Sequence, residues 1–273
     1  MPSNYPSQLA ALVRLNLIQL VRSPSHPQAK QAASRLLRQT CWLAAIGAAL
    51  ILALMFAVDA SEIGLMPRRG TPSLWQFRIL TDFGADVYVL EGLAVTLIVI
   101  VLVAPGLRDR SRLPLLGFGA RLEYLFLAVL VPVLSGEIVK WVVGRGRPFV
   151  GGKANAFNFV PFNGTEAYFS FPSAHSITAF ALAFAVAAVW PRARIAMVVY
   201  AILIAITRLV LLAHHPSDVV AGALFGLIGA MWVRYWFASR RLGFTIGQSG
   251  EIMPLTRPTL SGLKRVAGGA SGP

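Results

Sequence analysis

Six apolar stretches, each close to the length that crosses a lipid bilayer, divide most of this 273-residue sequence. A transmembrane α-helix needs about 20 mainly apolar residues. The stretches are separated by more polar segments and lie at residues 41–58, 87–107, 122–143, 174–190, 195–213 and 217–237. The sequence therefore predicts an all-α fold, a polytopic membrane protein built as a bundle of six transmembrane helices.

The composition agrees with a multi-pass membrane protein, because 56% of the residues are hydrophobic and only 13% are charged. A net charge of +14 would suggest nucleic acid as the partner of a soluble protein. In a membrane protein it reports basic cytoplasmic loops instead, so we expect a lipid bilayer and no nucleic acid. The single cysteine, Cys41, excludes an intrachain disulfide framework and a cysteine-rich zinc site. No HExxH motif occurs either, so no metal or other cofactor is expected.

The distribution of basic residues predicts the orientation. If the N-terminus is cytoplasmic, most of the 25 lysines and arginines fall on the inner side, before residue 41, at 108–121 and 192–194, and from Arg234 onward. Cytoplasmic loops carry such an excess of basic residues. Both termini are therefore expected in the cytoplasm.

Three regions follow from this topology. Residues 1–40 form a cytoplasmic segment, residues 41–240 the membrane domain, and residues 241–273, rich in Gly, Ser and Pro, a flexible cytoplasmic tail. Within the first region, "LAALVRLNLIQLVRS" has an apolar helical stripe bordered by Arg14 and Arg22. That pattern suits an amphipathic helix on an anionic inner leaflet, and equally a helix packed on the bundle.

Three polar segments interrupt the apolar pattern, and the predicted topology puts all of them at the outer surface. The first, "KWVVGRGRP", ends the stretch 122–143, where its glycines and proline should stop the helix. The second, "SFPSAHS", begins the stretch 174–190, and the third, "TRLVLLAHHPSD", joins the last two stretches. Together they supply Lys140, Arg145, Arg147, Ser173, His175, Arg208, His214, His215 and Asp218.

Each residue has an ordinary structural explanation when it is taken alone. Lysines and arginines at helix ends extend to lipid headgroups, Ser173 suits a helix N-cap, and Asp218 suits a first helical turn. Arg208 is harder to explain, because "AILIAIT" precedes it and "LVLLA" follows it. Burying an arginine there costs about 2.5–3.5 kcal/mol, so it needs a partner.

Taken together, the segments indicate phosphoryl chemistry. Fixed cations and the free N–H groups at a helix N-terminus match the charge of a phosphoryl group. Two histidines can divide the work, one attacking phosphorus and one protonating the leaving oxygen. Pro216 suits the first position of a helix, so Asp218 can reach back to His214 and fix its tautomer. Glu137, one turn before Lys140, is expected to pair with it.

The spacings of these residues resemble the three-part signature of the type 2 phosphatidic acid phosphatase family, related to the vanadium-dependent haloperoxidases. The resemblance covers about residues 120–235 and rests on Lys140-x6-Arg147-Pro148, Pro172-Ser173-x-His175 and Arg208-x5-His214-x3-Asp218. Three motifs in the right order make a specific signal. Arg145 and His215 match no motif position.

The resemblance implies a role for each motif residue. His214 is similar to the family's nucleophile, which forms a phosphohistidine, Asp218 to the residue that orients it, and His175 to the acid that protonates the leaving group. The family works without a metal and usually has Gly where Ala174 stands. The residues similar to the phosphate cradle are Lys140, Arg147, Ser173, the amide of Ala174, and Arg208.

The expected function is that of a metal-independent lipid phosphatase in a bacterial inner membrane, with its active site on the periplasmic side. The expected substrate is a lipid phosphate or diphosphate, such as undecaprenyl diphosphate or phosphatidic acid. One alternative is a phosphotransferase that moves phosphate from a lipid diphosphate to a glycolipid such as lipid A. Another is a non-catalytic lipid-phosphate binder or transporter, which would keep its function in His214→Ala.

Overall fold

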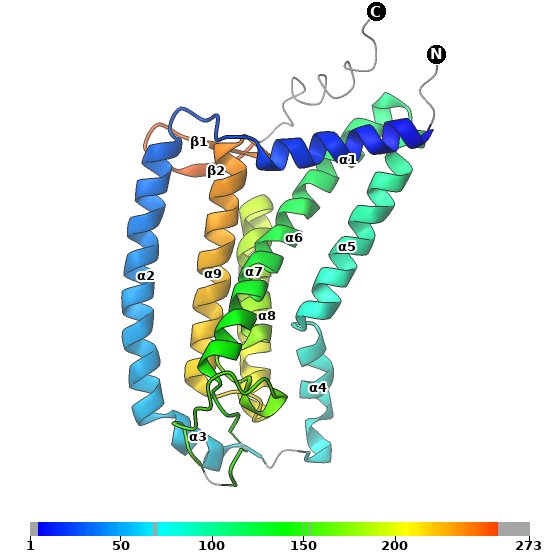
Figure 1. Cartoon of the computed structure of the whole chain (residues 1–273). Helices are drawn as coiled ribbons and strands as arrows, with labels where there is room; N and C mark the ends of the chain where they lie inside the picture. The colour runs from blue at the N-terminus through cyan, green and yellow to red at the C-terminus, as the bar shows by residue number, and fades with distance from the viewer. Residues whose placement is uncertain (1–4, 68–69, 149, 153, 256–273) are drawn as a thin grey trace, which may run out of the picture. The chain divides into compact units, whose positions relative to one another are not determined.

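The computed structural model describes residues 5–67, 70–148, 150–152 and 154–255, and it is mostly helical (Figure 1). The α-helices are α1 Tyr5–Val21, α2 Ala29–Ala57, α3 Asp59–Leu65, α4 Trp75–Asp82, α5 Asp86–Val103, α6 Asp109–Val143, α7 Ala174–Val189, α8 Arg194–Val210 and α9 Pro216–Ser239. Short 3-10 turns lie at Pro72–Leu74, Ala104–Gly106, Glu166–Tyr168 and Pro191–Ala193. The strands are β1 Phe244–Ile246 and β2 Ile252–Pro254.

Five described helical segments are long and apolar enough to cross a membrane, which supports an integral membrane protein. They are Ala29–Ala57, Pro72–Gly106, Asp109–Val143, Pro191–Val210 and Pro216–Ser239. The sixth predicted span, 174–190, forms α7, which has 16 residues. At the rise of an α-helix it extends about 24 Å, less than the ~30 Å hydrocarbon core. The count of six spans and the cytoplasmic position of both termini stay predictions.

Several helices extend beyond the apolar stretches that predicted them. α2 begins at Ala29 rather than near Cys41, and α6 begins at Asp109, so most of the basic segment 108–121 between two apolar stretches is helical. The segment 59–86, between the first two apolar stretches, contains α3 and α4. Arginine and leucine favour helix, so a polar sequence at the end of a span does not mark the end of the helix.

The chain divides into two compact units that alternate along the sequence. The first comprises residues 1–35, 91–126 and 233–273, and the second comprises residues 36–90 and 127–232. In the first unit β1 and β2 form an antiparallel pair with Phe244 opposite Pro254, and Tyr124 packs edge-on against Phe237 and Phe244. The tail expected to be flexible from residue 241 thus begins with a hairpin, whereas 256–273 lie outside the described residues.

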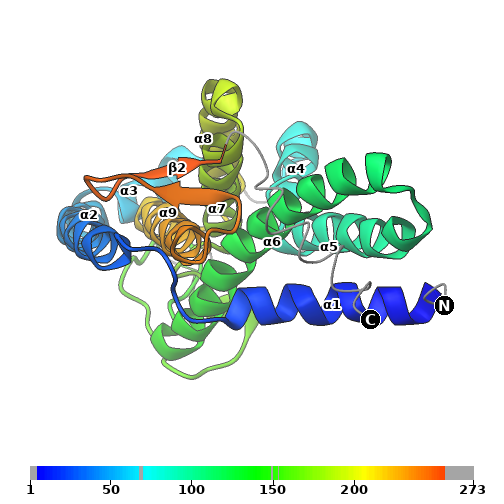
Figure 2. The same ribbon diagram turned by 90° about the horizontal axis from the view of Figure 1, so that it is seen from above.

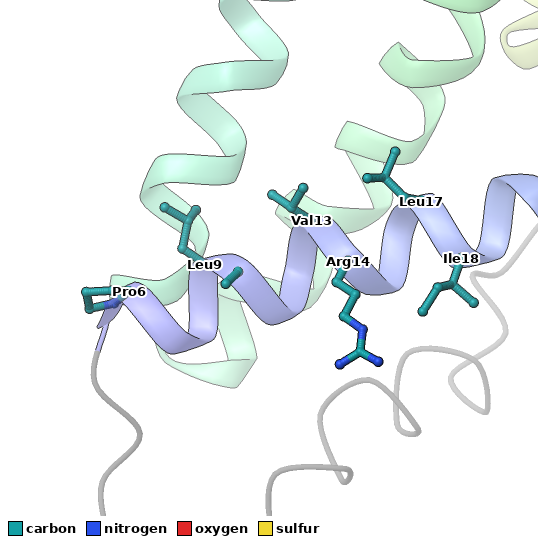
Figure 3. Close-up of a pocket in the computed structure, with 7 residues that line it drawn as sticks. Pro6, Leu9, Val13, Arg14, Leu17 and Ile18 are labelled. Atoms are coloured by element: carbon teal, nitrogen blue, oxygen red, sulfur yellow. The ribbon is translucent and has the colours of Figure 1, made fainter.

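In the first unit, the helix expected within residues 1–40 is α1. Tyr5 donates a hydrogen bond to the carbonyl of Leu102 at 2.6 Å, and Asn16 donates one to Glu123 at 2.5 Å, so one side of α1 contacts its own unit. Figure 3 shows a hollow along α1 lined by Pro6, Leu9, Ala10, Val13, Arg14, Leu17 and Ile18. It contains none of the predicted site residues.

The second unit holds all the predicted site residues, and small side chains bring its helices close together. α7 and α8 lie side by side in Figures 1 and 2, with Ala179, Ala183, Ala201 and Ile204 forming a buried cluster. On α9, a Cβ at Gly222 would lie 2.5 Å from the carbonyl oxygen of Ser173. Glycine is therefore needed for α9 to pack against the start of α7.

The end of α6 is also set by a glycine. Gly144 has φ +56°, and a Cβ there would lie 1.9 Å from the carbonyl oxygen of Val160. The helix stops at Val143, as the glycines and proline of "VVGRGRP" predict. The chain then turns back, and the amide of Val160 donates to the carbonyl of Gly144 at 2.7 Å.

Candidate active site

The three predicted segments come together in the second unit and are joined by main-chain hydrogen bonds. The amide of Ser170 donates to the carbonyl of Arg145 at 3.0 Å, which links the segment after α6 to the approach to α7. The amide of Ser173 donates to the carbonyl of Asp218 at 3.0 Å, which links the start of α7 to the first turn of α9. The backbone itself therefore fixes the spacing between the segments.

His214 lies in the turn between α8 and α9, with its side chain almost fully buried. Its Nδ1 atom lies 2.7 Å from the carbonyl oxygen of Ser170. A carbonyl only accepts, so the network assigns the proton to Nδ1 and leaves the lone pair of the neutral ring on Nε2. That is the form of histidine that acts as a nucleophile.

The surroundings of His214 keep its ring neutral. Burial, followed by the positive charges of Arg208, Arg147 and Lys140, holds the pKa of His214 well below its ordinary value. Burial penalises the imidazolium form, and neighbouring cations penalise it further. The same three cations that the sequence assigns to a phosphate cradle therefore act on this histidine.

Asp218 was expected to contact the imidazole directly, and the structure shows an indirect connection. Its Oδ2 atom is 3.9 Å from Nδ1 of His214, beyond hydrogen-bond range. The same oxygen accepts hydrogen bonds from the hydroxyl of Ser170 at 2.6 Å and from the amide of His215 at 2.9 Å. Asp218 thus holds Ser170, and the carbonyl of Ser170 holds the ring.

The start of α7 has the geometry of an anion site. Ser173 is the N-cap residue, with φ −70° and ψ 115°, and its side chain makes no capping hydrogen bond. Among the described residues the buried Oγ of Ser173 has no hydrogen-bond partner, although buried polar atoms normally have one. A phosphate oxygen would satisfy it, together with the free amides of the first helical turn.

Ala174 and His175 form the first turn of α7 beside Ser173. Ala174 is the first helical residue and is absent from the described residues with positive φ. A Cβ is therefore accommodated at the position where the family usually has glycine, and the backbone N–H of Ala174 is kept. His175 is half-buried, as a residue that meets a substrate should be.

The three cradle cations come from different elements. Lys140, in the last turn of α6, forms the expected ion pair with Glu137. Arg147 approaches Glu166 at 3.3 Å, and Arg208, near the end of α8, donates to the hydroxyl of Thr81 on α4 at 2.6 Å. Arg208 is buried, and the hydroxyl of Thr81 is one of its partners.

Two fully buried charged residues, Arg145 and Asp59, could not be assigned to the site from the sequence. Arg145 donates from Nη1 to Asp218 at 2.5 Å and from Nη2 to Asp59 at 2.8 Å. Asp59 begins α3, directly after the membrane helix α2. The only signal for Asp59 was a carboxylate at the end of an apolar stretch, and the signal for Arg145 was its place among the outer cations.

A second carboxyl group of α3 is also buried. Glu62 is 5% exposed, and neither of its carboxyl oxygens has a hydrogen-bond partner within the described residues. Burial, followed by the negative charges of Asp59 and Asp218, raises the pKa of Glu62 to about 7. Among the residues described, no three His, Cys, Asp or Glu side chains form a group suited to a metal ion, and the metal-free mechanism stays a prediction.

Comparisons with known proteins match this half of the chain. Residues 121–242 match the model of the PAP2 superfamily. A lipid A 1-phosphatase of Rhizobium johnstonii is 39% identical over 127 residues, 46% of this chain and 52% of that protein. A lipid A 1-phosphatase of Rhizobium etli is 43% identical over 103 residues, 38% of this chain and 44% of that protein. The chain thus spans about half the length of the curated relatives it matches, and no solved structure gives a significant match.

Proposed function

We propose that this chain, whose residues 121–242 match the model of the PAP2 superfamily, is a membrane lipid phosphatase of that superfamily. It removes a phosphate group from a lipid phosphate or diphosphate at the extracytoplasmic face of a bacterial inner membrane. The observation that carries the proposal is the geometry of His214. Its Nδ1 atom is held by the carbonyl of Ser170, and three cations act on the ring whose Nε2 is left as the nucleophile.

In the first chemical step, Nε2 of His214 attacks phosphorus and the bond from phosphorus to the leaving oxygen breaks. Lys140, Arg147 and Arg208 balance the charge on the equatorial oxygens, and the Oγ of Ser173 and the amide of Ala174 donate to them. His175 gives its proton to the leaving oxygen. The phosphorylated ring keeps its Nδ1 proton on the carbonyl of Ser170.

In the second step, water replaces the histidine. His175, now neutral, takes a proton from the water as its oxygen attacks phosphorus. The bond between phosphorus and Nε2 breaks, inorganic phosphate leaves, and His214 returns to its neutral form. Because this chain's own cations carry the charge of the phosphoryl group, the proposed reaction proceeds in the presence of a chelator.

We propose a lipid A phosphate as the first substrate to test, because both relatives are named as lipid A 1-phosphatases. Undecaprenyl diphosphate, phosphatidic acid and phosphatidylglycerol phosphate complete the panel. The phosphotransferase and the non-catalytic binder considered from the sequence are not favoured, since both relatives are named as phosphatases.

The test measures release of inorganic phosphate from each lipid by the purified protein in detergent with EDTA. His214→Ala should lower turnover by about 10³-fold or more, because the covalent step is lost. A matched control is His26→Gln, since His26 is a buried histidine of the first unit that bonds Thr245. Turnover that survives His214→Ala, or that requires added Mg²⁺, would contradict the proposal.

A further inference from the structure

Arg145 matches no family motif, yet its side chain is bound to residues of the candidate site. It is fully buried, and all three guanidinium nitrogens donate hydrogen bonds. Nη1 reaches the hydroxyl of Ser217 at 2.6 Å and Asp218 at 2.5 Å, while Nη2 reaches Asp59 at 2.8 Å. Nε and Nη2 also donate to the carbonyl of Ala156, at 3.1 and 2.8 Å. A planar, forked donor is required for this pattern, and lysine cannot reproduce it.

Asp59 holds the other side of this arginine and the start of α9. Its Oδ1 atom accepts from the amide of Ser217 at 3.1 Å, and its Oδ2 atom accepts from the hydroxyl of Ser217 at 2.5 Å. A carboxylate that accepts main-chain N–H groups in the first turn of a helix stabilises the helix and fixes its direction. Asp59 thus fixes both Arg145 and the turn of α9 that carries Asp218.

These contacts form a continuous path to the nucleophile. Arg145 binds Oδ1 of Asp218, which leaves Oδ2 directed at the hydroxyl of Ser170 and the amide of His215. The carbonyl of Ser170 then holds Nδ1 of His214. A buried group of two carboxylates and one guanidinium is costly to desolvate, and in some proteins such groups serve conformational specificity rather than stability.

We propose that Arg145 and Asp59 are positioning residues for the reaction. They fix the rotamer of Asp218 and, through Ser170, the direction of Nε2 of His214. The inference rests on the proposed function and extends it. The site then includes Asp59, which lies outside the matched family segment 121–242 and follows the first membrane helix.

The first test compares Asp59→Asn with wild type. The asparagine side chain can still accept at Oδ1, but it no longer balances the charge of Arg145. A small misplacement of a reacting group lowers the rate steeply, so kcat should fall by about 10- to 100-fold. KM should not change, since the cradle of Lys140, Arg147 and Arg208 is intact. The control is Glu123→Gln, which removes a carboxylate bonded to Asn16 in the first unit.

A double variant separates positioning from simple stability. Arg145→Gln leaves two buried carboxylates without a cation, so the yield of folded protein should fall. Asp59→Asn/Arg145→Gln removes one charge of each sign, so folding should recover. Turnover per folded molecule should stay low in the double variant, because no guanidinium then binds Oδ1 of Asp218 and holds its rotamer. A purely structural pair would instead recover both folding and kcat, and that result would overturn the inference.

A measurement without substrate tests the positioning role separately from the proposed phosphatase function. Diethyl pyrocarbonate acylates neutral imidazole, and mass spectrometry reports the rate at each histidine. In Asp59→Asn the rate at His214 should rise, because the ring leaves its buried orientation, whereas the rate at His26 should not change. Phosphate release absent from wild type would count against the proposed function alone. Wild-type kcat and wild-type acylation of His214 in Asp59→Asn would overturn the positioning role alone.

Discussion

Two charged regions meet at His214, and they hold their charges in different ways. In the positioning group of Asp59, Arg145, Ser217 and Asp218, every side chain is fully buried and bound to the others. In the cradle, Lys140 and Arg147 pair with carboxylates whose side chains are 43% and 91% exposed. In the proposed mechanism, permanent ion pairs therefore fix the nucleophile, while solvent-screened pairs leave the cradle cations able to exchange a carboxylate for a phosphate.

The largest effect is expected on stability, when the buried ion pairs of the positioning group are removed. Arg145→Met should lower the free energy of unfolding by about 3–5 kcal/mol, because Asp59 and Asp218 are left buried without their cation. The measurement is thermal or denaturant unfolding in detergent. Glu166→Gln, which removes the exposed carboxylate beside Arg147, is the matched control and should unfold like wild type. If the two variants were equally stable, the ion pairs of the positioning group would contribute no more to stability than those of the cradle.

The cradle should show the opposite behaviour, with activity lost and stability kept. Arg147→Gln should lower kcat/KM by about 10²- to 10³-fold, as expected for removal of one group that stabilises transition-state charge. Its unfolding should stay close to that of wild type, since the side chain of Glu166 is mostly exposed. Arg192→Gln, an exposed arginine in the turn before α8, is the control and should keep full activity. A large loss of stability in Arg147→Gln would count against an adaptable cradle.

The two regions join where α9 packs on the start of α7, and a single methyl group tests that contact. In Gly222→Ala the new Cβ would lie 2.5 Å from the carbonyl oxygen of Ser173. Overpacking of this kind typically costs about 1–3 kcal/mol, and it should also displace Ser173 from Asp218 and lower kcat. Gly92→Ala, on α5, is the control, because no described atom lies within 4 Å of its added Cβ. Unchanged kcat in Gly222→Ala would show that the site tolerates movement of α7.

The smallest effect is expected on the pH dependence of stability, through the protonation of Glu62. Its pKa is raised to about 7, so between its ordinary value of 4.5 and pH 7 the folded protein binds more proton than the unfolded chain. Stability from this group is therefore lost as the pH rises through that window. Glu62→Gln should raise the melting temperature more at pH 8 than at pH 5. The same gain at both pH values would show that Glu62 does not titrate between pH 5 and pH 8.

Much of the site could be predicted from the sequence, because its signals are local. The stop of α6 at Gly144, the start of α7 after Pro172, and the start of α9 at Pro216 all follow from residue types with fixed backbone preferences. The family resemblance drawn from the three motifs is confirmed by the match over residues 121–242. The membrane-spanning helices followed from length and hydropathy, apart from α7, which is short.

The other features of the fold and the site depend on tertiary contacts, which leave no local pattern in the sequence. Asp59 and Glu62 look like ordinary acidic residues of an outer loop, and only the fold shows that both are buried. Asp218 and His214 lie close together, as the spacing predicts, but the hydrogen bond of Nδ1 is made by the carbonyl of Ser170 and not by the carboxylate. The segment rich in Gly, Ser and Pro predicts a flexible tail, and only the structure shows the hairpin of β1 and β2 at its start.

The ion pair between Asp59 and Arg145 also has a consequence for related sequences. Since either charge alone is unfavourable in a buried setting, a lineage that replaces one residue gains by replacing the other. In an alignment of homologues, positions 59 and 145 are therefore expected to vary together, although 86 residues separate them. Such covariation would identify, from sequence alone, which relatives fix their nucleophile from the segment that follows the first membrane helix.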